Sequence, residues 1–272
     1  MIEMLYGESA ALVAVALLIA AAVIVELGYF AGRRIKERGR DLSAGRVDTV
    51  LSSMLGVLAL VLAFTFSLSL QRFESRSQAV VDEANAIGTA YLRSYLLPTS
   101  IRSDSRELLR DYLDLRVQST RISTDLNAAR RAVLAKAAAA QNVLWSYARQ
   151  AAEEAPNPVT SGLYIQSLND LIDAFGRRNA TLDRHVPEPV LYVLYSVFLI
   201  VAGVVGFGAG VAGHRPFLVS YIMVAVVVLL MFLIVDLDRP RRGLIRVDET
   251  SLADLQTAIA AGTYGNGIVP PH

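Results

Sequence analysis

Four long apolar stretches constrain this chain more than any other feature of its sequence. A bilayer core about 30 Å thick needs roughly 20 helical residues, because each adds about 1.5 Å. Every stretch has 20 to 24 residues, and Glu26 is the only charged residue inside them. The sequence therefore predicts an all-α membrane protein with four transmembrane helices at about residues 10–30, 50–70, 190–213 and 216–235. We interpret the first as an uncleaved anchor, since no basic residue precedes it.

Composition supports this class and excludes others. The chain has 272 residues, of which 54% are hydrophobic and 19% charged, as is typical of membrane proteins. A net charge of +1 gives no basic field for nucleic acid. There is no cysteine, which removes disulfides, thiolate metal sites and cysteine nucleophiles. The three histidines are scattered and no nucleophile motif is recognisable, so we expect no metal, no cofactor and no enzymatic activity.

Breaks in the hydrophobic pattern divide the chain into four parts. Between the second and third apolar stretches, apolar residues recur at spacings of three and four, which indicates amphipathic helices. Pro98, "APNP" and "HVPEP" interrupt this pattern, so a soluble bundle of about four helices is expected. The tail contains one possible helix, "SLADLQTAIAA". The expected parts are a first transmembrane hairpin (1–70), the soluble bundle (71–188), a second hairpin (189–236) and a C-terminal tail (237–272).

The second apolar stretch continues into the soluble part without a break. No proline occurs in "LAFTFSLSLQRFESRSQAVVDEANAIG", residues 62–88, so one helix from about residue 48 to 97 is expected. On a helical wheel at about 100° per residue, one arc of about 80° mixes small, polar and two bulky apolar residues. We call this arc the α-helical stripe; its members are Ser53, Gly56, Leu60, Phe64, Ser67 and Gln71.

The stripe has two physical uses. Small residues allow helices to pack closely, as in small-xxx-small motifs. Alternatively, several copies in a ring would line an ion path, in which hydroxyl groups contact ions and bulky apolar residues form a constriction. Leu60 and Phe64 would form that constriction. The residues alone leave both uses open.

Two segments resemble a known family. "LAFTFSLSLQRFESRSQAVVDEANAIGTAYLRSYLLP" and "VDLDRPRRGLIRV" are similar to the bestrophin-like family of bacterial membrane proteins, a domain of unknown function. A more distant resemblance links the chain to bestrophins, which are pentameric anion channels. It implies a homo-oligomer, a pentamer by analogy, in a bacterial inner membrane, with small inorganic ions, including anions, as partners.

The bestrophin resemblance also implies roles for single residues. Three bulky apolar residues spaced by four form the bestrophin pore neck, and the matching positions are Gly56, Leu60 and Phe64. Gly56 departs from that pattern, which implies a shorter neck. The run of consecutive carboxylates that forms a calcium clasp in animal bestrophins is absent, because Asp236 and Asp238 stand among arginines. We therefore expect no calcium control.

Other polar residues have a structural and a functional interpretation. Glu26 is either an interface anchor that reaches toward Arg33, or an intramembrane contact for an ion or proton. Arg72, Glu83 and Asn85 either hold the bundle together or form a polar vestibule. The glycines of "GFGAG", residues 206–210, favour close helix packing over a phosphate loop, because no strand precedes them.

Membrane orientation follows from basic residues. The loop 31–49 carries six of them (Arg33, Arg34, Lys36, Arg38, Arg40 and Arg46), and the segment before the first stretch has none. The positive-inside rule places that loop in the cytoplasm and the soluble bundle outside. Four arginines after the last stretch (Arg239, Arg241, Arg242 and Arg246) argue for the opposite orientation, and so does the bestrophin resemblance.

Two functions are consistent with the sequence. The first is a homo-oligomeric, bestrophin-like ion channel with a pore lined by the second transmembrane helix. The second is a membrane-anchored structural or sensing protein without conduction, in which the stripe only packs helices. The expected partners are the lipid bilayer, further copies of the chain and small inorganic ions. A closed ring with the second transmembrane helix at its axis would support the first function, and a monomer or dimer the second.

Overall fold

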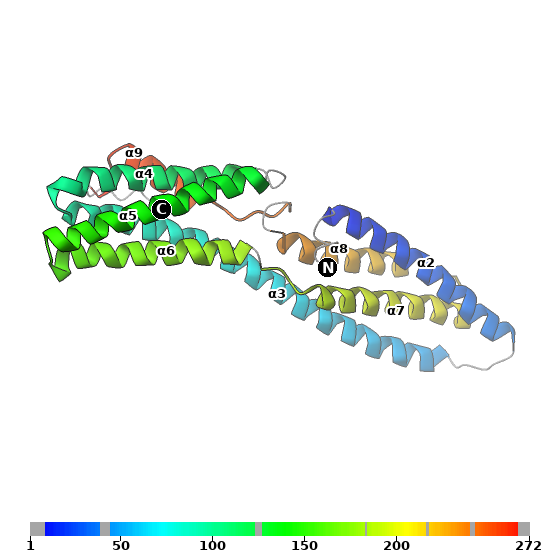
Figure 1. The fold of residues 1–272 in the computed structure, drawn as a ribbon. Helices are drawn as coiled ribbons and strands as arrows, with labels where there is room; N and C mark the ends of the chain where they lie inside the picture. The colour runs from blue at the N-terminus through cyan, green and yellow to red at the C-terminus, as the bar shows by residue number, and fades with distance from the viewer. Residues whose placement is uncertain are drawn as a thin grey trace. The chain divides into compact units, whose positions relative to one another are not determined.

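The computed structural model describes residues 9–38, 44–122, 127–182, 184–215, 218–239 and 243–265, and the regular structure in these ranges is helical (Figure 1). Contacts divide the chain into two compact units. One comprises Met1–Phe73 and His185–Arg246, and the other comprises Glu74–Arg184 and Val247–His272. We call them the membrane unit and the soluble unit and describe each by itself.

The membrane unit contains the apolar helices. They are α2 (Ala10–Glu37), the first part of α3 (Ala44–Arg93), α7 (Glu188–Ala212) and α8 (Leu218–Leu237). Four helices in the described part of the chain are long and apolar enough to cross a bilayer, which confirms the four expected transmembrane helices. The first extends further than expected, so that the basic residues up to Lys36 lie on α2 rather than in a loop.

Local capping explains where two of these helices begin and end. The Ser9 hydroxyl accepts a hydrogen bond from the backbone N–H of Leu12 at 3.1 Å, which satisfies a donor that the first turn of α2 leaves free. At the end of α7, Gly213 adopts a φ of 88°, and the N–H groups of Gly213 and His214 both bond to the carbonyl of Ala209. Glycine suits this left-handed position because it has no Cβ.

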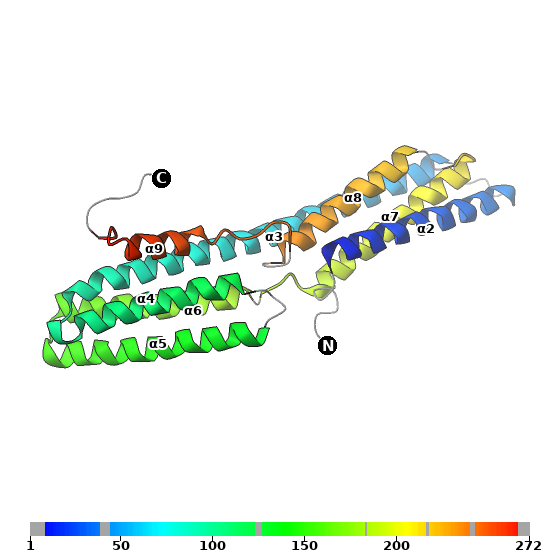
Figure 2. The ribbon, with the colours of Figure 1, turned by 90° about the horizontal axis from the view of Figure 1, so that it is seen from above.

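Glycines hold α2 and α7 together at backbone distance. A Cβ on Gly28 or Gly32 would overlap the backbone carbonyls of Gly203 or Phe207 in α7. A Cβ on Gly206 or Gly210 would likewise overlap backbone carbonyls of α2. We call these four glycines the α2–α7 seam. The expectation that "GFGAG" packs closely against another helix is therefore confirmed, and α2, α7 and α8 lie side by side in both views (Figures 1 and 2).

The soluble unit is a helical bundle with one continuous core. It is formed by the second part of α3, by α4 (Thr99–Arg121), α5 (Asn127–Glu154) and α6 (Leu163–Leu182), and by α9 (Thr250–Ala260). Its core residues come from all five helices, among them Ile87, Leu109, Tyr112, Leu144, Leu168, Leu171 and Leu252. The bundle expected from the sequence is thus present, and α9 joins it from the tail.

The expected breaks lie where the chain turns between these helices. Helix α3 ends at Arg93 and is followed by a short 3-10 turn, Ser94–Leu96, after which Pro98 precedes α4. A single π-helical turn, Pro158–Gly162, separates α5 from α6, and the Asn157 side chain caps it. Proline lacks the N–H that a continuing helix needs, so each break follows from local chemistry.

A glycine substitution tests the α2–α7 seam. We expect Gly206→Ala to destabilise the protein by about 1–3 kcal/mol, because the added methyl overlaps the Val25 backbone and overpacking costs this order of energy. The measurement is the melting temperature in mild detergent, with unfolding monitored by circular dichroism at 222 nm. Gly45→Ala is the matched control, since its methyl would meet no atom within 4 Å. Equal melting temperatures for the two variants would contradict the seam.

Candidate functional site

The stripe residues of α3 face away from the rest of the chain. All six are exposed, with Leu60 at 59% and Phe64 at 65%. Large apolar side chains with this exposure on a single helix face need another covering surface, either lipid or protein. On the opposite side of α3, Leu58 is 3% exposed, and Thr65 and Ser69 are fully buried. Within the described part of a single chain, no other helix therefore covers the stripe.

Two serines near the start of α3 have hydroxyls that bond within their own helix. The hydroxyls of Ser52 and Ser53 donate to the carbonyls of Asp48 and Thr49, four residues earlier, at 2.8 and 3.1 Å. Such bonds satisfy a hydroxyl within its own helix. Gly56 lies between them and Leu60, and a Cβ there would meet no atom within 4 Å. Gly56 is thus not part of a packing seam inside the chain, unlike the glycines of the α2–α7 seam.

The three polar residues expected beyond the stripe have different surroundings. Arg72 is half-buried, Asn85 is exposed, and Glu83 is fully buried in the soluble unit. The structure does not bring Asn85 into the environment of Glu83, because residues two apart on a helix point to nearly opposite sides.

Glu83 forms the centre of a buried ion cluster. Its Oε1 accepts from Arg116 Nε at 2.6 Å and its Oε2 accepts from Arg116 Nη2 at 3.2 Å, and Oε2 also accepts from Arg178 Nη1. Arg178 Nη2 lies 3.1 Å from a carboxylate oxygen of Glu249, just before α9. Glu83, Arg116 and Arg178 are each at most 2% exposed. We call these four residues the Glu83 cluster.

The Glu83 cluster ties four segments of the soluble unit together. Glu83 belongs to α3, Arg116 to α4 and Arg178 to α6, and the Arg116 guanidinium also lies 4.6 Å from the ring centroid of Phe175. Buried charges are tolerated only when they are paired, since the desolvation of each ion costs several kcal/mol. The sequence indicated a polar role for Glu83, but gave no signal for its two arginine partners, which lie far away along the chain.

Arg76 is another buried arginine that the sequence did not single out. It is 1% exposed, and its Nη2 donates to the Arg184 carbonyl at 2.7 Å while its Nε donates to the Thr181 carbonyl at 3.3 Å. The Thr181 carbonyl lies in the last turn of α6 and Arg184 follows that helix, so the guanidinium sits where the helix dipole favours a cation. Arg76 therefore fixes the end of α6 to α3.

Glu26 contacts a different residue from the one expected. Its Oε1 accepts a hydrogen bond from the Tyr221 hydroxyl of α8 at 2.7 Å. Arg33 instead pairs with Glu37 one turn further along α2, at 2.8 Å. The expectation that Glu26 reaches toward Arg33 was wrong, because a closer donor on a neighbouring helix satisfies the carboxylate inside the membrane unit.

Two aspartates at the end of α8 organise the following segment. Asp236 accepts from the backbone N–H groups of Leu244 and Ile245, both at 3.0 Å. Asp238 accepts from the N–H of Val186 at 2.8 Å, just before α7. Both aspartates are at most 3% exposed. Their carboxylates serve as local acceptors for backbone groups, a role that the sequence analysis did not assign to them.

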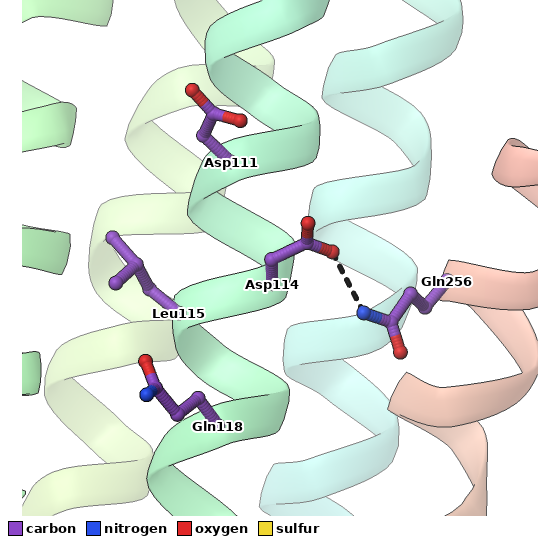
Figure 3. Close-up of a pocket in the computed structure, with 5 residues that line it drawn as sticks. All are labelled: Asp111, Asp114, Leu115, Gln118 and Gln256. Carbon is purple, nitrogen blue, oxygen red and sulfur yellow. Dashed lines mark hydrogen bonds between the residues drawn. The ribbon is translucent and has the colours of Figure 1, made fainter.

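A shallow pocket of about 540 Å³ lies between α4 and α9 (Figure 3). Its lining is polar except for Leu115, and Asp114 accepts a hydrogen bond from the Gln256 side chain at 2.7 Å. Among the residues that the structure describes, no group of three histidine, cysteine or acidic side chains is placed to hold a metal ion. The pocket thus marks where α9 docks on α4.

Comparison with known proteins identifies the fold. A model of the bestrophin-like domain matches residues 14–252. Among solved structures, a bacterial bestrophin homologue from Klebsiella pneumoniae is 17% identical, with a TM-score of 0.66 over 94% of this chain and 99% of that chain. A singly substituted form of a bacterial bestrophin homologue from Klebsiella pneumoniae is 18% identical, with a TM-score of 0.66 over 92% of this chain and 98% of that chain.

A third crystal structure, described as a membrane protein, is 17% identical, with a TM-score of 0.68 over 92% of this chain and 98% of that chain. A comparison with curated proteins finds no match. The similarity to solved structures confirms the expected architecture of four transmembrane helices plus a helical bundle.

Neutralising Glu83 tests the buried cluster. We expect Glu83→Gln to destabilise the soluble unit by about 3–5 kcal/mol, because two buried guanidinium groups lose their shared carboxylate. The measurement is the urea concentration at which the full chain unfolds in detergent, monitored by circular dichroism. Asp82→Asn is the matched control, since Asp82 accepts a hydrogen bond from Gln78 at the surface of the same helix. If both variants unfold at the same urea concentration, the cluster does not hold the bundle.

Proposed function

This chain belongs to the bestrophin-like family, and from that premise we propose that it is a homo-oligomeric ion channel whose pore is lined by the stripe of α3. The observation that carries the proposal is the exposure of all six stripe residues in a helix that crosses the membrane. Small inorganic ions, including anions, are the proposed substrates, and the family resemblance suggests a pentamer.

A ring of copies accounts for the chemistry of the stripe. Identical subunits usually assemble with closed cyclic symmetry, which brings the same helix of each copy to a common axis. Leu60 and Phe64 would then form successive apolar rings, and apolar constrictions control conduction by excluding water. Gly56 leaves the path wider one turn away, and the serine hydroxyls supply contacts for ions.

The second candidate is a membrane-anchored structural or sensing protein. In that case the stripe packs against another copy, and Gly56 permits close approach of two backbones. It is favoured by one observation, the small side chains that flank Gly56 on α3. The two candidates differ in what a larger side chain at Gly56 does, because a pore has free space there and a packing seam has none.

Substitution of Phe64 tests conduction directly. We expect Phe64→Ala to raise ion flux through reconstituted liposomes severalfold, because it removes the bulkiest ring of the constriction. Leu62→Ala is the matched control on the other side of α3, and it should change stability rather than flux. Unchanged flux in Phe64→Ala, beside a measurable wild-type flux, would contradict the proposed constriction.

Gly56→Leu then separates the two candidates in the same assay. In a pore, the leucine adds a bulky ring, lowers flux and leaves the oligomer intact, since no atom of the chain lies within 4 Å of that position. In a packing seam, it separates the helices and breaks the oligomer. Native mass spectrometry in mild detergent reports the assembly. A monomeric wild-type protein would contradict both the proposed ring of subunits and the proposed pore.

Orientation is the remaining part of the proposal. We propose that the basic segment 31–49, which includes the end of α2 and the start of α3, faces the cytoplasm of a bacterium, with the protein in the inner membrane and the soluble unit outside. Arg33 and Lys36 make local contacts at the end of α2 and α7, whereas Arg239 is buried. Arg40, Arg241 and Arg242 lie outside the described residues.

Reporter fusions test the orientation. We expect green fluorescent protein fused after residue 40 to fluoresce and alkaline phosphatase at the same site to be inactive, because basic segments stay on the cytoplasmic side. Fusions at the C-terminus should give the reverse pattern. Active alkaline phosphatase after residue 40 would place the soluble unit in the cytoplasm.

A further inference from the structure

Two tyrosines and two arginines form an unusual polar cluster in the soluble unit. Tyr91 lies at the end of α3 and Tyr95 in the following 3-10 turn, and Arg106 and Arg110 lie one turn apart on α4. Arg106 Nη2 donates to the hydroxyls of Tyr91 at 2.8 Å and Tyr95 at 2.6 Å. Arg110 Nη2 donates to the Tyr91 hydroxyl at 3.0 Å. We call these four residues the Tyr–Arg cluster.

No carboxylate in the described ranges forms an ion pair with this cluster, although the exposed Glu107 adds a negative charge near Arg110. Within the described ranges, neither Arg106 nor Arg110 lies within ion-pair distance of an acidic side chain, and the neighbouring Glu107 is exposed. By contrast, the buried arginines of the Glu83 cluster do have carboxylate partners. Arg106 instead stacks on the tyrosines, 4.0 Å from the centroid of the Tyr95 ring and 5.1 Å from that of Tyr91. Two like charges are therefore held together by neutral groups.

The cluster presents hydrogen-bond donors and no free acidic acceptor. The Tyr91 oxygen accepts from both arginines, so its own O–H remains available to a third group. The same holds for Tyr95, whose oxygen accepts from Arg106. Arg106 Nε is buried and has no hydrogen-bond partner among the described residues. Guanidinium N–H groups and phenol O–H groups together match the oxygens of an oxyanion.

The two arginines also lower the pKa of Tyr91, as expected near positive charge. Burial alone would raise the pKa of Tyr91, but the hydrogen bonds from Arg110 and Arg106 outweigh it, and the pKa lies below its ordinary value. Tyr112, buried in the same bundle away from this cluster, has a raised pKa because burial dominates there. The hydrogen bonds that lower the pKa of Tyr91 come from the same two arginines that the geometry places on its hydroxyl.

The site is accessible on one side and walled on the other. Arg110 is exposed and Tyr95 is 43% exposed, whereas Tyr91 is 3% exposed. The Tyr264 ring, which follows α9, lies 6.5 Å from that of Tyr91. The Tyr264 side chain has room there because Gly88 has no Cβ. A Cβ on Gly88 would overlap the Tyr264 hydroxyl. An anion can thus approach from solvent and rest against the two tyrosines.

We propose that the Tyr–Arg cluster binds a free multivalent oxyanion of the phosphate class. Planar guanidinium groups recognise two oxygens of such an anion at once, which a single chloride ion cannot offer. The site lies in the soluble unit, outside the stripe, and its occupancy does not require that the protein conducts ions.

Calorimetry on the full chain in mild detergent tests this site, with pyrophosphate and inorganic phosphate as the probes. The wild-type protein should bind pyrophosphate more tightly than phosphate, because it offers more charged oxygens. Arg110→Gln should weaken pyrophosphate binding by about tenfold or more, since a hydrogen bond to a charged group contributes that order of affinity. Tyr95→Phe should weaken it by a smaller factor. Arg149→Gln, an exposed arginine of α5, is the matched control and should bind as the wild type does.

Three results would overturn the proposal. One is the absence of binding heat with either probe at millimolar concentration. Another is equal affinity of Arg110→Gln and Arg149→Gln, which would mean that any binding is generic. The third is loss of the oligomer in Arg110→Gln by native mass spectrometry, which would show that this arginine pairs with a second copy. Liposome flux is measured separately, so failure here leaves the conduction test intact.

Discussion

Backbone contact between α2 and α7 is the constraint on which the membrane unit depends. Lipid tails supply no hydrophobic force between helices, so close packing of glycine faces has to hold them together. Gly28 and Gly206 allow the carbonyl of one helix to occupy the space where the other would carry a side chain. With these two helices joined and α8 packed on α2, α3 contributes only one face to the unit. Its other face, the stripe, is left for whatever surrounds the chain.

The parts of this fold that could be predicted from the sequence are those set by local chemistry. The apolar stretches predicted the transmembrane helices, and Pro98 and "APNP" predicted the breaks between helices. The glycines of "GFGAG" predicted a surface of close helix packing. Helical periodicity grouped the six stripe residues, all of which prove to be exposed, although whether they line a pore is a proposal. Orientation and assembly depend on groups outside the single chain and were not accessible in this way.

The clusters in the soluble unit could not be predicted, for a physical reason. Glu83 and its partner Arg178 are 95 residues apart, and nothing in the pattern around an arginine indicates which carboxylate it will meet. The residues of the Tyr–Arg cluster are closer together in the sequence. The inference of an anion site, however, depends on the absence of a carboxylate paired with its arginines among the described residues, and only the packed structure reveals that. The contact of Glu26 with Tyr221 likewise joins helices that are distant along the chain.

The position of Glu249 has a consequence for how the protein is made. This residue and α9 belong to the soluble unit, but the ribosome synthesises them after both α7 and α8. During translation, α3 to α6 emerge before α9 and can assemble while Arg178 still lacks its second carboxylate. The last part of the bundle arrives only when the final transmembrane helix has been produced. Completion of the water-exposed half is therefore coupled in time to completion of the lipid-embedded half.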